Sequence, residues 1–80
     1  MSTKQELKDQ LWIAEKRLAL YLKAEDAILH GQSYEAEGLK LTRANLKDVQ
    51  TMIASLEAKI SALKAKLRGR SSFRIVRPGW

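Results

Sequence analysis

The segment from Gly31 to Leu46, GQSYEAEGLKLTRANL, most constrains the fold, because it separates two long helical patterns and is not helical itself. Within it, two short runs, Ser33–Ala36 and Leu39–Thr42, flank the pair Glu37-Gly38. A two-residue loop that ends in glycine is typical of a tight β-hairpin. The segment therefore predicts a miniature hairpin over about residues 32–42, placed between two helices.

The first helical pattern covers about residues 4–30. Thr3 and Glu6 form a capping-box pattern at its start, and Gly31 follows its end as a left-handed C-cap glycine would. Glu25 interrupts its apolar face, either at a solvated rim or in a polar contact with the second helix or a neighbouring subunit. The apolar residues recur at spacings of three and four: Leu7, Leu11, Ala14, Leu18, Tyr21, Ile28 and Leu29, with Leu22 at the edge.

The second helical pattern is a heptad seam expected over about residues 43–68, with Thr42 able to cap its start and Gly69 ending it. The seam residues are Leu46, Val49, Ile53, Leu56, Ile60, Leu63 and Leu67. A short hairpin between two long helices favours an antiparallel pair, whose end can be covered by Tyr34, Leu39 or Leu41. The expected class is α+β, mostly helical, with an extended C-terminal tail.

Two further small or apolar patches do not fit inside a two-helix core. The patch on the first helix contains Ile13, Leu20, Ala24 and Ala27, with Trp12 to one flank. The patch on the second helix contains Ala54, Ala58, Ala62 and Ala65, opposite the seam. The alanines are explained either by helix propensity alone or by a smooth ridge that another subunit approaches. The second apolar side of the first helix favours a subunit contact, because it would otherwise be exposed.

Length and charge limit the chain further. Eighty residues without a cysteine form one domain with no disulfide, a composition that suits a reducing compartment and points towards oligomerisation or docking. No signal-peptide pattern is present, and the longest apolar run, Leu18–Leu22, is too short to span a membrane. The net charge of +6 is uneven: residues 1–30 are neutral, 31–42 carry −1, 43–67 carry +3 and 68–80 carry +4.

The last residues, 69–80, form a basic and hydrophobic tail that is expected to be disordered unless bound. Three interpretations remain open. The tail adds as a strand to a partner's sheet edge, or it binds nucleic acid through its arginines and aromatic rings, or it has no role. The candidate contact residues are Arg68, Arg70, Phe73, Arg74, Ile75, Val76, Arg77 and Trp80.

No catalytic, metal or cofactor constellation is recognisable in the sequence. The one histidine, His30, lies at the end of the first helix, where a cation interacts favourably with the helix dipole. Glu35 and Glu37 lie close together on the hairpin, but two carboxylates without a pocket are more typical of a solvated turn than of an acid/base pair. The four glycines are scattered and form no phosphate-binding loop.

The element order, together with two motifs and the tail, resembles a known family. The motifs are Gly31-Gln32-Ser33-Tyr34 and Leu41-Thr42-Arg43-Ala44-Asn45-Leu46, and the tail runs from Arg68-Gly69-Arg70 to Trp80. They resemble the head-to-tail joining protein W (gpW) family of tailed phages and related short prophage proteins. The resemblance covers nearly the whole chain, although this hairpin is shorter than that of the W protein. It implies two antiparallel helices with a two-stranded hairpin, a structural role at the neck of the virion, and no catalysis.

The resemblance leads to specific expectations about function. The protein is expected to be a head-completion or connector protein that is assembled in the host cytoplasm and located at the virion neck. Its expected partners are other copies in a ring, the phage portal and a further neck or tail protein, with no membrane. The tail arginines could also screen DNA phosphates near the channel, a contact without sequence preference that the sequence leaves open. The alternatives are a small basic nucleic-acid-binding protein and a generic helical-hairpin interaction module.

Overall fold

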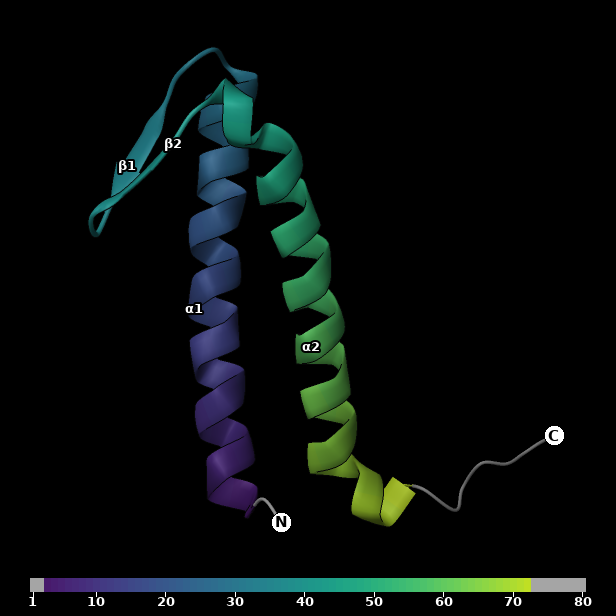
Figure 1. Ribbon diagram of the computed structural model, residues 1–80. Helices are drawn as coiled ribbons and strands as arrows, with labels where there is room; N and C mark the ends of the chain where they lie inside the picture. Colours follow the sequence, from purple (N-terminus) through teal and green to yellow (C-terminus); the bar gives the residue numbers. More distant parts are fainter. Residues whose placement is uncertain (1–2, 73–80) are drawn as a thin grey trace, which may run out of the picture.

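The computed structural model describes the backbone of residues 3–72 and the side chains of residues 3–68. Two long helices, α1 (Lys4–Leu29) and α2 (Leu46–Ser72), lie antiparallel (Figure 1). A two-stranded sheet and a short 3₁₀ helix connect them. The predicted class, a mostly helical α+β chain with a hairpin between two helices, is confirmed.

Helix α1 begins and ends at signals that are visible in the sequence. The backbone N–H of Glu6 donates to Oγ1 of Thr3 (3.0 Å), and the backbone N–H of Thr3 donates to Oε1 of Glu6 (2.9 Å). This reciprocal capping box begins the helix at Lys4, as predicted. At the other end, Gly31 has φ +83° and donates its N–H to the carbonyl of Ile28 (3.0 Å). Gly31 is therefore the left-handed glycine that ends α1.

The hairpin consists of β1 (Tyr34–Ala36) and β2 (Leu39–Leu41), which pair antiparallel with Glu35 opposite Lys40. Both loop residues have positive φ, +51° at Glu37 and +80° at Gly38. Positive φ at both central residues matches the twist of the flanking strands, which is why such turns join short hairpins. The predicted hairpin is confirmed, with each strand one residue shorter than the predicted run.

A 3₁₀ helix, η1 (Arg43–Asn45), precedes α2 and was not predicted as a separate element. Thr42 is its N-cap residue, and the backbone N–H of Thr42 donates to Oδ1 of Asn45 (2.9 Å). The prediction that Gly69 ends the second helix is wrong, because α2 continues to Ser72. Glycine inside a helix costs only about 1 kcal/mol relative to alanine, so it permits a helix end without forcing one.

The core forms along the facing surfaces of the two helices, and the heptad seam of α2 is confirmed. Its five central residues are buried: Val49, Ile53, Leu56, Ile60 and Leu63. On α1, Ala14 packs with Leu56 and Ile60. Nearer the hairpin, Ala24 and Ile28 pack with Val49 and Ile53 of the seam and with Leu41. Leu46 and Leu67, at the two ends of the seam, are half-buried.

Two positions on α1 differ from the sequence expectation. Ala24, assigned to a second outer side, is fully buried in the core, whereas Leu29, assigned to the core face, is 56% exposed. The helix ends directly after Leu29, so no further turn covers it. Glu25 is half-buried at the rim and also contacts α2, since its Oε2 accepts a hydrogen bond from Nε2 of Gln50 (3.0 Å).

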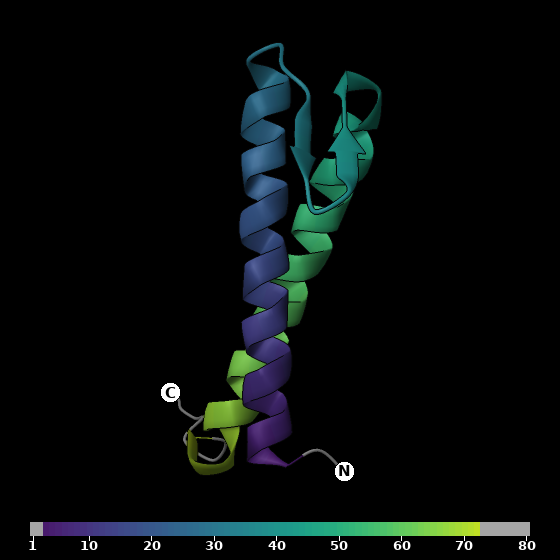
Figure 2. The same ribbon diagram turned by 90° about the vertical axis from the view of Figure 1, so that its left-hand side faces the viewer.

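The hairpin folds back beside the helices instead of extending away from them. Figures 1 and 2 together show β1 and β2 running back along the C-terminal half of α1, with the loop pointing towards its middle. Leu41 is buried against the helices, and Tyr34 and Leu39 are half-buried against the same cluster. These three residues, expected to cover the end of the helix pair, pack instead against the core cluster from beside the helices, and the N-terminal half of α1 has no hairpin beside it.

Candidate protein-binding surface

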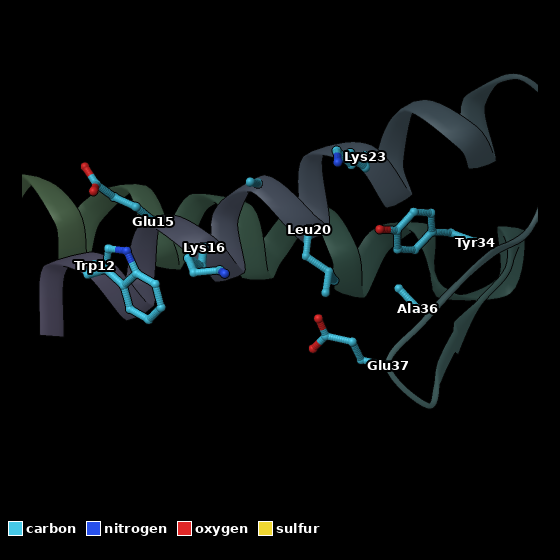
Figure 3. Close-up of a pocket in the computed structure, with 9 residues that line it drawn as sticks. Trp12, Glu15, Lys16, Leu20, Lys23, Tyr34, Ala36 and Glu37 are labelled. Carbon is cyan, nitrogen blue, oxygen red and sulfur yellow. The ribbon is translucent and has the colours of Figure 1, made fainter. Parts of the chain in front are cut away.

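An open groove of about 450 Å³ lies between α1 and the hairpin. Figure 3 shows its two walls, one built from α1 and the other from β1 and the loop. The apolar lining residues are Trp12, Ala19, Leu20, Tyr34 and Ala36, and the charged ones are Glu15, Lys16, Lys23 and Glu37. The groove is therefore an apolar strip bordered by two acids and two lysines, which suits a peptide segment better than a polar small molecule.

Trp12, which lines this groove, is the most exposed large apolar side chain of α1 among the described residues, and Ile13 beside it is exposed as well. Trp12 is 61% exposed and Ile13 is 45% exposed. The ammonium group of Lys16 lies 4.8 Å from the centre of the Trp12 ring, a cation–π contact that orients the indole. Leu20, which lines the groove together with the loop residue Glu37, is half-buried. The predicted outer patch is thus only partly exposed: Trp12 and Ile13 are exposed, whereas Leu20 is half-buried in the wall of the groove.

The alanine stripe of α2 occupies a different face. Ala54, Ala58, Ala62 and Ala65 are all exposed and lie opposite the buried seam. The structure therefore does not bring this stripe together with the groove. The exposure of these alanines agrees with both sequence interpretations. In an isolated chain they would be exposed whether they only favour the helix or also form a ridge that another subunit contacts.

The hairpin contributes to both the core and the groove. Tyr34 packs against the core cluster and also lines the groove, whereas Leu41 belongs to the core alone. On the opposite face of the hairpin, Nζ of Lys40 lies 3.7 Å from Oε2 of Glu35. This cross-strand pair is exposed, so it adds little to stability, but it gives the two strands opposite charges.

Most of the predicted tail contacts lie outside the described residues: Phe73, Arg74, Ile75, Val76, Arg77 and Trp80, together with the side chain of Arg70. Arg68 is described and exposed, and it lines a separate shallow groove with Leu18 and Ile60. The end of α2 that carries the tail lies near the start of α1, at the opposite end of the molecule from the hairpin connection (Figure 1).

The chemistry available in the described part of the chain is limited. His30 Nδ1 lies 2.7 Å from the carbonyl oxygen of Asp26, at the end of α1. Among the described residues, no three histidine, aspartate or glutamate side chains are grouped so that they could hold a metal ion. None of the described helices is long and apolar enough to cross a membrane.

The groove itself was missed by sequence reasoning. Helical periodicity showed that α1 has a second apolar side, but it could not show on which side the hairpin folds back. The sequence did contain one signal of this groove. Tyr34 is an aromatic residue at the start of a very short strand, and a fully solvated hairpin has no need of an aromatic side chain there. Its partner surface on α1 became apparent only from the fold.

The chain matches one family model, described as a family of unknown function (DUF6148), over residues 1–78. The chain therefore belongs to this family. No curated protein and no solved structure matches it.

Proposed function

We propose that this member of the DUF6148 family is a structural assembly protein, a head-completion or head-tail connector that oligomerises in a ring and docks on a phage portal. The observation that carries the proposal is the outer surface of α1, where Trp12 and Ile13 are exposed beside an apolar groove. The protein acts by binding other proteins and performs no catalysis.

Exposed aromatic residues at the centre of an apolar patch are typical binding anchors. Trp12 presents a large apolar area at low conformational cost, and the ammonium group of Lys16 lies over its ring. Helix α1 is already anchored to α2 by a buried face, so it offers this second face on a rigid support. A chain of 80 residues with such a face is expected to gain stability by association.

The resemblance to the head-to-tail joining family suggests the place of this association. It supports the neck of a virion, with the portal and a further neck or tail protein as partners. The basic tail, net +4 over residues 68–80, would then lie where DNA passes and contact phosphates without reading sequence.

The direct test is to mix the protein with portal rings encoded in the same genome and to image the rings. Wild-type protein is expected to decorate them, and the variant Trp12→Ser/Ile13→Ser is expected to decorate them at least about tenfold more weakly, because it removes two apolar anchors. The matched control is Met52→Ser, which removes a 41% exposed apolar side chain from α2. Bare portal rings with wild-type protein would refute the proposal.

A nucleic-acid-binding function is favoured by one observation, the exposed basic residues in the C-terminal half of α2. These are Lys59, Lys64, Lys66 and Arg68. Titration of duplex DNA at two salt concentrations distinguishes this function, since phosphate binding weakens steeply with salt. Absence of any salt-sensitive affinity would eliminate it.

Neighbouring genes for terminase, portal and capsid would favour the connector over a generic interaction module.

A further inference from the structure

The hairpin has an unpaired edge that borders the groove. Ala36 and Leu39 flank the two-residue loop and so form a hydrogen-bonded pair, which makes Glu35 and Lys40 the next, non-hydrogen-bonded pair. The N–H and C=O groups of Glu35 therefore point away from β2, towards the free edge of β1. Tyr34 and Ala36 of β1 line the groove and no residue of β2 does, so β1 is the strand that borders it (Figure 3).

The three residues of β1 alternate as apolar, acidic and apolar: Tyr34, Glu35 and Ala36. The acidic member is exposed, and its two neighbours are half-buried on the face that meets α1. One segment of the same chain has the complementary pattern. Phe73, Arg74 and Ile75 alternate as apolar, basic and apolar, and they lie outside the described residues.

We propose that residues 73–75 of a second copy add as a third strand at the free edge of β1, with Arg74 beside Glu35. In this register the exposed face carries a row of alternating charge, Lys40, Glu35 and the second copy's Arg74. The opposite face places Phe73 and Ile75 beside Tyr34 and Ala36, over the groove. Backbone hydrogen bonds from Glu35 supply the affinity, and the alternating side chains supply the register.

Charge selects β1 over β2 as the docking edge. The outer edge of β2 carries Lys40 at its centre, so the same tail placed there would set Arg74 beside a lysine. Like charges directly opposite on neighbouring strands destabilise the pairing. Of the four segments compared above, residues 31–42 are the one with net negative charge, −1, whereas residues 68–80 carry +4.

The occupant must come from a second copy, because the tail of the same chain cannot reach. Lys64 Nζ lies 3.9 Å from Glu15 Oε2, which fixes how the two helices align. From that point Ser72 lies about 12 Å further along α2, whereas Leu20, which lines the groove together with Ala36 of the hairpin, lies about 8 Å along α1 in the opposite direction. Phe73 is within about 4 Å of Ser72, so it falls far short of its own hairpin.

This contact joins two different surfaces, a tail and a hairpin edge, so it is heterologous. Repetition of a heterologous contact generates a ring when the rotation closes and a filament when it does not. The inference rests on the proposed function in this respect, because it names the contact that joins neighbouring copies in the ring. The tail contact differs from the proposed function because two copies of the chain can form it without a portal.

The test is a charge exchange measured by sedimentation of the full chain without portal. Wild-type protein is expected to self-associate. Arg74→Glu alone and Glu35→Lys alone are each expected to weaken association by about tenfold or more, because each replaces an attraction with a repulsion. An equimolar mixture of the two variants is expected to restore association, since tails and hairpin edges of opposite charge are then both present.

The controls separate charge pairing from other causes of failure. Glu57→Lys makes the same charge change as Glu35→Lys at an exposed position on α2 and is expected to associate like wild type. Circular dichroism of each variant shows that it is folded. A wild-type chain that stays monomeric at 500 µM, taken as about the highest practical concentration, or a mixture that fails to recover, would overturn the inference. Portal decoration by the wild-type protein is measured separately, so a wild-type chain that decorates portal rings but does not self-associate refutes the tail contact and not the proposed function.

Discussion

The two ends of the helix pair are packed differently. At the hairpin end, Ala24 and Val49 are fully buried and Ile28 is 1% exposed, because helices and hairpin meet there. At the opposite end only two helices meet, and Leu7, Leu11 and Leu67 remain half-buried. Two helices alone bury residues of their central seam, such as Ala14 and Leu63, but they leave side chains near their open ends partly exposed, whereas a third element adds cover. The hairpin end is therefore the more completely enclosed part of the core, and the open end leaves apolar surface exposed.

The largest expected effect is the difference in stability between equivalent core truncations at the two ends. Ile28→Ala is expected to lower the free energy of unfolding by about 3 kcal/mol, because it leaves a cavity among packed neighbours. Leu11→Ala is expected to lower it by about 1 kcal/mol, because a half-buried site is already partly hydrated. Urea unfolding of both variants measures the comparison, and equal losses would contradict it.

The next effect concerns two glycines, one at each end of the molecule. Gly31→Ala is expected to destabilise the chain by about 1 kcal/mol, because alanine is strained at φ +83° although nothing lies within 4 Å of the added methyl. Gly69→Ala is expected to stabilise it by about 0.5 kcal/mol, because Gly69 lies inside α2. Thermal unfolding of each variant shows whether the substitution stabilises or destabilises the chain. A destabilising Gly69→Ala would indicate that the helix ends at this glycine.

These glycines also show how far the sequence determines the fold. Both come directly after a helical pattern, but Gly31 precedes two polar residues and a strand pattern, whereas Gly69 precedes an arginine. The heptad seam, the capping box and the two-residue loop were predictable because each depends on neighbours in sequence. The burial of Ala24 was not predictable from the sequence, because it depends on where Leu41 of the hairpin packs.

The candidate surface was predictable only in part, for the same physical reason. Trp12 and Ile13 lie outside the core face by periodicity alone, and both are exposed. The groove depends on the direction in which β1 folds back along α1, which a local pattern does not contain. The tail pattern of Phe73, Arg74 and Ile75 acquired a specific expected partner only when the edge of β1 and the charge of Glu35 were known.

A smaller effect, in the opposite direction, is expected at the hairpin loop. Glu37 has φ +51°, a conformation that asparagine tolerates better than glutamate. Glu37→Asn is therefore expected to raise the free energy of unfolding by about 0.5 kcal/mol and to stabilise the hairpin end further. Urea unfolding measures the change, and Glu57→Asn on α2 is the control for the loss of charge. A loss of stability in the loop variant would indicate that Glu37 makes a contact worth more than its backbone strain.

The smallest effect compares the polar links between α1 and α2 in the two halves. Gln50 and Glu25 are joined by a 3.0 Å hydrogen bond near the hairpin, whereas Lys64 and Glu15 form a 3.9 Å ion pair nearer the open end. Both links are largely solvated, so a double-mutant cycle is expected to give about 0.5 kcal/mol or less for each. Only the Lys64–Glu15 coupling is expected to fall at high salt, because Gln50 carries no charge to be screened. Equal salt sensitivity of the two couplings would show that long-range charge, and not the local contact, joins the helices at both positions.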